Sequence, residues 1–186
     1  MQIKMFTEHP DRRPKPNGNT FFGESFQRKV ANQTPNLIGE EMRGTFVRDG
    51  IAINFSNDIV TRNSIIEVKS INREVEDWYL QSSILQCAVY SALLQKTNGR
   101  LVTSTFFESQ GNPSVSTVVN PRIDYFLRFG DNMYKVVVNN PNRIVDFILE
   151  KAKSCLDWES AKRFDAQYKQ REYQVLSSCF YCIQVK

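Results

Sequence analysis

Two acidic residues and a lysine lie close enough in this chain to act on one substrate. Asp58 precedes a polar tetrapeptide at residues 61–64, and Glu67 and Lys69 follow it. Such a tetrapeptide between two apolar stretches predicts a β-hairpin. Cross-strand partners hold their Cβ atoms about 4.5–5.5 Å apart, so two facing carboxylates repel unless a cation lies between them. Oxygen ligands with no imidazole or thiolate nearby predict Mg²⁺ or Mn²⁺.

The turn also sets the register of the hairpin. The expected cross-strand pairs are Val60 with Ile65, Ile59 with Ile66 and Asp58 with Glu67. Because side chains alternate along a strand, Glu67 and Lys69 project from one face, and Ile66 and Val68 from the other. A lysine therefore flanks the expected metal pair.

This set of groups suits hydrolysis of a phosphodiester. A metal ion polarises the phosphate and lowers the pKa of a bound water, while a lysine positions that water or neutralises the charge that develops on the phosphate. No nucleophilic side chain is needed. We therefore expect catalytic roles for Asp58, Glu67 and Lys69.

Other chemistries are disfavoured by what the sequence lacks. Its one histidine, His9, lies in a proline-rich stretch, which argues against a histidine-based triad or a multi-histidine zinc site. No G-x-x-x-x-G-K-[ST] or G-x-G-x-x-G segment occurs, so the usual phosphate cradles of ATPases and nicotinamide enzymes are missing. The net charge of +4 permits a polyanionic partner without requiring one.

The elements that must position these residues follow from apolar periodicity. Helices are predicted at residues 21–30, 74–95, 142–158 and 159–174, and strands at residues 37–47, 50–55, 58–60, 65–69, 101–107, 115–119 and 133–138. In the first helix Phe22, Phe26 and Val30 recur every four residues, a stripe expected to face a core.

These elements predict one α/β domain. Residues 1–20 are expected to form a flexible N-terminal arm, and residues 21–186 a central mixed β-sheet of about five strands flanked by α-helices on both faces. The acidic pair would lie in a cleft beside two of the helices. No apolar run reaches the length of a membrane span, and the first residues lack a signal-peptide core, so we expect a cytoplasmic protein without membrane contact.

The pattern D-x8-E-x-K resembles the PD-(D/E)XK nuclease superfamily. In its RecB-type exonuclease branch a later helix carries Q-x-x-x-Y, matched here by Gln86 and Tyr90, and an early helix carries a glycine followed by an acidic residue, matched by Gly23 and Glu24. The chain departs from that branch at Gln27, where a histidine is usual, and at Asn57, where the superfamily often has proline. The matching motifs span residues 21–95.

The resemblance implies a restriction-endonuclease-like core and metal-dependent cleavage of DNA by an exonuclease of recombination, repair or phage DNA processing. It implies metal ligands at Glu24, Asp58, Glu67 and the backbone carbonyl of Val68, and DNA contacts from Gln86 and Tyr90. DNA is the implied partner, together with recombination or replication proteins, and a phage-encoded protein would act in the host cytoplasm.

Three alternatives stay open. The charged residues could be a solvated strand edge, with Gln86 and Tyr90 simply packing in a helix. The domain could bind nucleic acid or assemble with partners without catalysis, or it could be a structure-selective endonuclease such as a junction resolvase.

The four cysteines, Cys87, Cys155, Cys179 and Cys182, lack the spacing of the iron–sulfur clasp found in some RecB-type nucleases. We expect buried free thiols and no cluster.

Overall fold

The structure is a computed structural model that describes residues 18–71, 77–102, 116–154 and 169–185. Its helices are α1 (Gly18–Gln33), α2 (Asp77–Lys96), α3 (Pro141–Ser154), α5 (Lys169–Leu176) and the 3-10 turn η2 (Ser177–Cys179). Its strands are β1 (Leu37–Arg48), β2 (Ile51–Thr61), β3 (Ser64–Lys69), β4 (Arg100–Val102), β5 (Ser116–Val118), β6 (Asp124–Phe129), β7 (Asn132–Val138) and β8 (Phe180–Val185).

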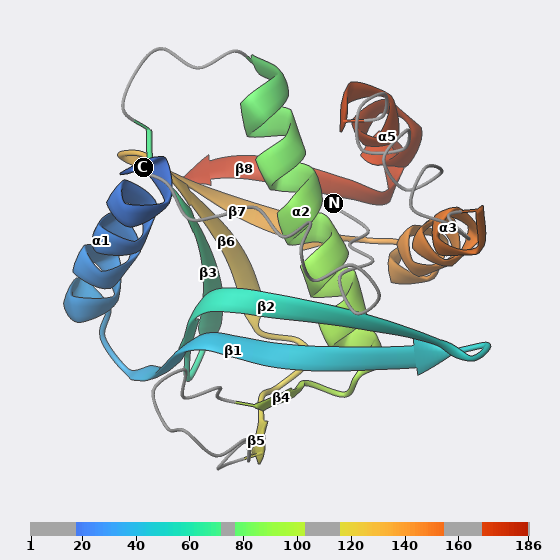
Figure 1. Cartoon of the computed structure of the whole chain (residues 1–186), viewed down its shortest axis with the longest axis horizontal. Coiled ribbons are helices and arrows are strands. Elements are labelled where there is room, and N and C mark those ends of the chain that lie inside the picture. The colour runs from blue at the N-terminus through green and yellow to red at the C-terminus, as the bar shows by residue number, and fades with distance from the viewer. Residues whose placement is uncertain (1–17, 72–76, 103–115, 155–168, 186) are drawn as a thin grey trace.

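The strands form one eight-stranded sheet in the order β5-β4-β1-β2-β3-β6-β7-β8 (Figure 1). Neighbours run antiparallel except β3 and β6, which are parallel, so the sheet is mixed. The predicted α/β class with a mixed sheet is confirmed. The expected number of about five strands is wrong, because β6 and β8 extend the sheet beyond β3.

Two tight turns fold the first three strands into a meander. Asp49 and Gly50 both have positive φ between β1 and β2, the conformation that two-residue hairpins prefer. Between β2 and β3 the Thr61 hydroxyl accepts the Ser64 N–H at 2.9 Å, so a side chain closes the turn. The turn predicted at residues 61–64 is confirmed.

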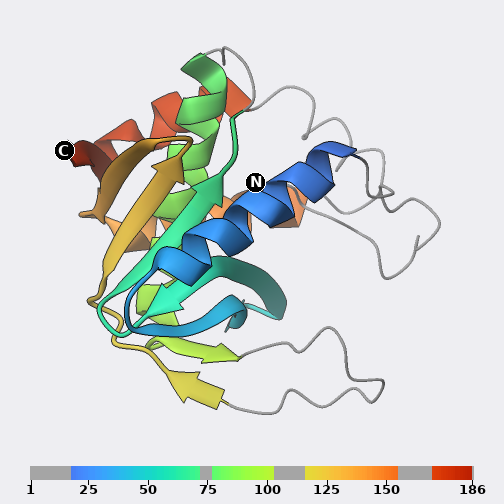
Figure 2. The ribbon, with the colours of Figure 1, turned by 90° about the vertical axis from the view of Figure 1, so that its left-hand side faces the viewer.

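Helices cover both faces of the sheet. On one face α2, α3 and α5 pack over the larger core, which includes Ile65, Leu127 and Ile144. On the other face α1 lies across β2 and β3 through Phe26, Val30 and Ala31 (Figure 2). The Glu67 strand thus lies between α1 and α2, the two helices predicted to lie beside the site.

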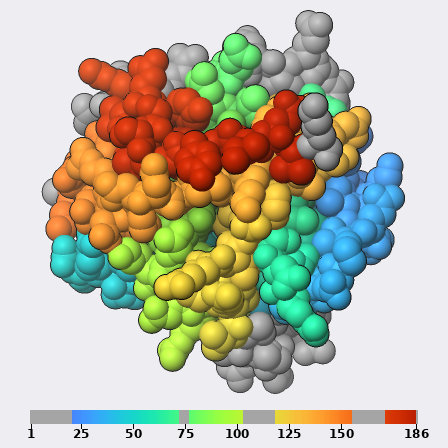
Figure 3. Space-filling model, turned by 180° about the vertical axis from the view of Figure 1, so that it is seen from behind, coloured from blue at the N-terminus to red at the C-terminus, as the bar shows by residue number. Residues whose placement is uncertain are grey.

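The face of β7 and β8 away from α2 carries no helix in the described part of the chain. Figure 3 shows β8 and β7 lying open at this surface, with α1 off to one side. Tyr181, Ile183 and Val185 of β8 are exposed here, whereas Phe180 is buried in the larger core. Strand β8 is also the terminal strand of the sheet.

Several predicted boundaries differ from the structure. The strands expected at residues 50–55 and 58–60 are one continuous strand, β2, because Asn57 is fully buried within it rather than in a break. The helix α1 starts at Gly18, inside the predicted arm. Residues 103–107 of a predicted strand, and residues 155–158 and 159–168 of two predicted helices, lie outside the described residues.

The apolar stripe of α1 is only partly buried. Phe26 and Val30 pack against the core as predicted, but Phe22 is half exposed. The prediction fails at Phe22 because the helix runs past the strands that it covers. Among the described helices, none is long and apolar enough to cross a membrane.

Candidate active site

The site lies where β2 and β3 separate. The ladder pairs Val60 with Ile65 and Ile59 with Ile66, which confirms two of the three predicted pairs. The third predicted pair, Asp58 with Glu67, is not part of the ladder. Beyond Ile59 the strands are joined by a side chain instead, because the Asp58 Oδ2 atom accepts the Val68 N–H at 2.7 Å. The Asp58 carboxylate therefore accepts the N–H that a backbone carbonyl would accept in a regular ladder, and Asp58 lies next to the strand that carries Glu67.

An irregularity in β2 explains this use of Asp58. Phe55 and Val60 both belong to the larger core, although they lie five residues apart, while Ile59 belongs to the core under α1. Regular alternation would put residues five apart on opposite faces, so the alternation shifts once between them. Opposite Asp58, Glu41 has a φ of 51° and interrupts the β1–β2 ladder.

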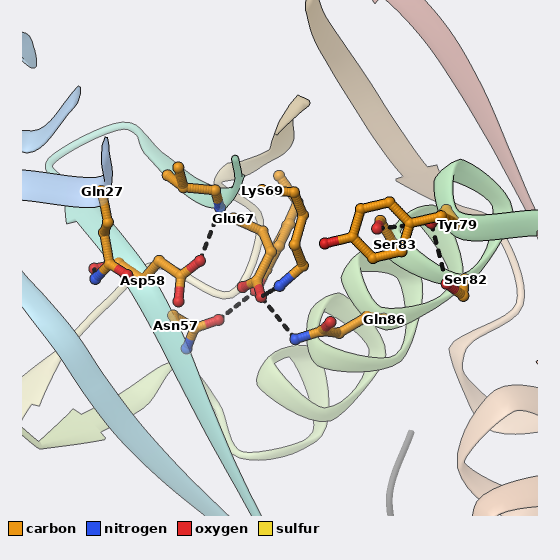
Figure 4. A network of polar contacts seen from close by, with 11 residues as sticks. Gln27, Asn57, Asp58, Glu67, Lys69, Tyr79, Ser82, Ser83 and Gln86 are labelled. Carbon is orange, nitrogen blue, oxygen red and sulfur yellow. Dashed lines mark hydrogen bonds and ion pairs between the residues drawn. The ribbon is translucent and has the colours of Figure 1, made fainter. Parts of the chain in front are cut away.

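The carboxylate of Glu67 is the most buried charge of the site, with 1% of its surface exposed. Its Oε1 atom accepts two hydrogen bonds, from Lys69 Nζ at 2.8 Å and from Gln86 Nε2 at 2.6 Å (Figure 4). Its Oε2 atom is buried and has no hydrogen-bond partner in the described part of the chain. Unpartnered buried oxygens are rare in folded proteins, so this one calls for an explanation.

The three charged groups shift one another's proton affinity. Burial, and then repulsion from Asp58, raises the pKa of Glu67 to about 7. Burial also raises the pKa of Asp58, with Lys69 opposing the rise. Burial works against the charge of Lys69, but attraction to Glu67 and Asp58 outweighs it, so the pKa of Lys69 is raised. Lys69 therefore stays an ammonium at neutral pH.

The helix α1 approaches Asp58 through Gln27 rather than Glu24. Gln27 donates its amide N–H to the backbone oxygen of Asp58 at 3.4 Å, while Glu24 is exposed. Among the described residues no three carboxylates, thiols or imidazoles lie together as a metal-binding group. The structure thus does not gather Glu24 with the two central carboxylates. The ligand role implied for the Val68 carbonyl stays a prediction.

Gln86 and Tyr90 both reach the site from α2, but they point inward. Gln86 is engaged with Glu67, and Tyr90 is hydrogen-bonded to Gln86 and packs on Phe55 with ring centroids 5.9 Å apart. Burial raises the pKa of Tyr90 to about 12. The predicted juxtaposition with the acidic pair is therefore present, whereas the predicted DNA contacts stay predictions.

Two polar features of the site were missed in the sequence. Asn57 is buried beside Asp58, where it accepts a hydrogen bond from the Tyr125 hydroxyl, and its Nδ2 atom has no partner in the described residues. Tyr79 lies seven residues before Gln86, two helical turns away on the same face of α2, and its hydroxyl points toward Lys69 (Figure 4). The i, i+7 spacing could have found Tyr79. The sequence marks Asn57 only as a departure from the proline that is frequent in the superfamily, and a polar residue before an acidic one resembles a strand end, so its burial was not predicted.

Two cysteines are buried as expected. Cys87 and Cys179 are buried free thiols, Cys182 is partly exposed, and Cys155 lies outside the described residues. Burial raises the pKa of the Cys87 thiol, so this group stays protonated next to the carboxylates.

Comparison with known proteins returned no match: no family model, no curated protein and no solved structure is similar to this chain.

The raised pKa of Glu67 predicts how stability depends on pH without added metal. From about pH 4.5 to 7 the folded protein binds a proton that the unfolded chain has released, so its stability falls as pH rises through this range. The difference in unfolding free energy between pH 5 and pH 8 should shrink by roughly 2–3 kcal/mol in Glu67→Gln, measured by urea unfolding in EDTA. Exposed Glu150 supplies the control Glu150→Gln, which should follow the wild type. Equal pH dependence in Glu67→Gln and wild type would contradict the assignment.

Proposed function

We propose that this protein is a divalent-metal-dependent nuclease with a restriction-endonuclease-like core that hydrolyses phosphodiester bonds of DNA. The observation that carries the proposal is the Glu67 carboxylate, which is buried beside Asp58 and Lys69 and has one oxygen without a partner among the described residues. Titratable groups with strongly shifted pKa values that lie together are a recurrent sign of a catalytic site.

A purely structural role explains these groups less well. One buried ion pair can be tolerated, but the second carboxylate, Asp58, which accepts the Val68 N–H, adds repulsion that raises the pKa of Glu67. A structural network would be expected to satisfy each of its buried atoms, yet Glu67 Oε2 has no hydrogen-bond partner in the part of the chain that the structure describes. The excess negative charge is what a bound cation would neutralise.

The donor set fits Mg²⁺ or Mn²⁺. The free oxygen of Glu67 and the carboxylate of Asp58 are hard ligands, and the nearby Cys87 thiol is kept neutral and is therefore a poor one. Asp58 and Glu67 would hold the ion, which when bound neutralises phosphate charge and lowers the pKa of water. Further oxygens would come from water and from the DNA, as is usual for magnesium.

Lys69 would supply a fixed positive charge to the phosphate. Because its ammonium is held charged by both carboxylates, it cannot accept a proton at neutral pH, which argues against a role as general base. One fifth of its side chain is exposed, so it can be reached from solvent. Its role is then to donate hydrogen bonds to the oxygen on which charge develops.

Gln86 would keep Glu67 in place. Its amide N–H binds the same Glu67 oxygen as Lys69 does, which leaves the second oxygen turned away from both donors. Such supporting contacts orient a metal ligand and favour its charged form. This is a positioning role, in contrast to the DNA contact that the resemblance implies.

The proposed function is tested by incubating the full chain with linear, nicked, circular and four-way DNA in Mg²⁺, Mn²⁺ or EDTA. An exonuclease should degrade linear DNA from its ends only when a divalent ion is present. Cleavage confined to four-way or circular DNA would favour a structure-selective endonuclease. Binding that survives EDTA, with no hydrolysis in either metal, would sink the proposal and favour a non-catalytic binding module.

Removing the Gln86 amide separates its two candidate roles. If Gln86 holds Glu67, Gln86→Ala should raise the pKa of Glu67, move the acid limb of the pH–rate profile upward and slow cleavage by about tenfold to a hundredfold. DNA affinity in Ca²⁺ should change little. Gln95 on the same helix supplies the control Gln95→Ala. Weaker DNA binding with an unshifted pH profile would instead support the direct DNA contact.

A further inference from the structure

Tyr79 occupies a defined position at the edge of the candidate site. It lies in the first turn of α2, where its backbone oxygen accepts the hydroxyl of Ser83 at 2.8 Å. Its ring contacts Phe129 and Trp78, with centroids 5.4 Å and 5.9 Å away. Neighbours on β6 and α2 therefore fix the ring, and Figure 4 shows its hydroxyl directed toward Lys69.

The hydroxyl of Tyr79 has no hydrogen-bond partner among the described residues, in contrast to the hydroxyl of Tyr125, which is bound to Asn57. The ring is only partly buried, so solvent or a ligand can reach the hydroxyl. A fixed ring with an available donor beside a fixed ammonium is an arrangement that binds an anion.

We infer that Tyr79 is a substrate-binding residue, whose hydroxyl donates a hydrogen bond to a non-bridging oxygen of the phosphate that Lys69 faces. This inference rests on the proposed nuclease function and adds a residue that the D-x8-E-x-K and Q-x-x-x-Y motifs do not contain. A phenol suits the role because its hydroxyl donates a hydrogen bond to a phosphate oxygen.

The test must separate the hydroxyl from the ring. Tyr79→Phe keeps the ring contacts with Phe129 and Trp78 and removes only the donor. The matched control is Tyr181→Phe on β8, where an exposed tyrosine lies on the other face of the sheet. Both variants should melt like the wild type, which establishes that the fold is kept.

With linear duplex DNA we expect Tyr79→Phe to slow single-turnover cleavage in Mg²⁺ by about tenfold or more, while Tyr181→Phe cleaves like the wild type. Binding of Mn²⁺ alone, measured by calorimetry, should be unchanged, because the hydroxyl does not touch the carboxylates. Wild-type rates in Tyr79→Phe would overturn the inference and leave the nuclease proposal intact. Absence of cleavage by the wild type itself would refute the nuclease proposal instead.

A phosphorothioate at the cut position identifies the oxygen. Sulfur is a poor hydrogen-bond acceptor, so in one diastereomer the substrate has already lost the bond from Tyr79. With that diastereomer, Tyr79→Phe should therefore slow cleavage little further. For the other diastereomer the penalty should persist. Equal penalties for oxygen and for both sulfur diastereomers would show that Tyr79 acts elsewhere, and would overturn the contact.

Discussion

In Mg²⁺, Asp58→Asn and Glu67→Gln are expected to cleave DNA more slowly than the wild type by a factor on the order of 10³ or more. Each change removes one charged oxygen while keeping the shape of the side chain. Asp58 and Glu67 are the two carboxylates at the place where β2 and β3 separate, and the Oε2 atom of Glu67 has no partner in the described residues. The loss should be seen in single-turnover assays and accompanied by weaker Mn²⁺ binding in calorimetry.

Acid-to-amide changes away from the Asp58 and Glu67 pair are the controls for this experiment. Glu150→Gln on α3 should cleave like the wild type, because Glu150 is exposed. Glu24→Gln tests the ligand set that the family resemblance implies: near-normal cleavage agrees with the exposed position of Glu24 on α1. Wild-type activity in Asp58→Asn or Glu67→Gln would refute the site itself, whatever the controls do.

Lys69→Met is expected to reduce cleavage by a factor on the order of 10² or more while leaving DNA affinity nearly intact. The reason is that Lys69 is held as an ammonium by the carboxylates and stabilises charge only when it develops on the phosphate. DNA affinity would be titrated in Ca²⁺ and cleavage followed in single turnovers in Mg²⁺. Melting without metal should be followed in parallel, because the change also removes the partner of Glu67.

Two other outcomes have distinct meanings. If Lys69 only anchors a phosphate, the variant should bind DNA more weakly with a shallower salt dependence, and its rate at saturating DNA should stay near that of the wild type. If Lys69 only neutralises Glu67, lowering the pH should restore much of the stability measured without metal, because protonation of Glu67 then removes the unpaired charge. An unchanged single-turnover rate would exclude the catalytic role.

Local patterns predicted the part of the site that depends on one hairpin. The register of β2 and β3 followed from the turn at Thr61 and Ser64, and the shared face of Glu67 and Lys69 followed from strand alternation. The position of Gln86 followed from helical periodicity together with the family resemblance. In each case the contacts lie within one turn, one strand or one adjacent helix, where the spacing of residues determines the geometry.

The missed parts depend on distant contacts. The alternation of Tyr125, Leu127 and Phe129 could have indicated β6, but its parallel pairing with β3 is set by tertiary packing. Strand β8 shows no clear alternation, because Tyr181 and Ile183 are apolar yet exposed. The shift of alternation near Asp58 has no signature in the sequence, and the hydrogen bond between the neighbouring Asn57 and Tyr125 joins residues 68 positions apart.

The parallel pairing of β3 with β6 has a consequence for the order of folding. The paired residues, from Ser64 with Asp124 to Lys69 with Phe129, lie about sixty positions apart in the chain, so this contact closes a long loop. The β2–β3 hairpin closes only a short one and can form early. We therefore expect Glu67 and Lys69 to stay hydrated until β6 pairs with β3. Desolvation of the two charges would then belong to the late, slow stage of folding.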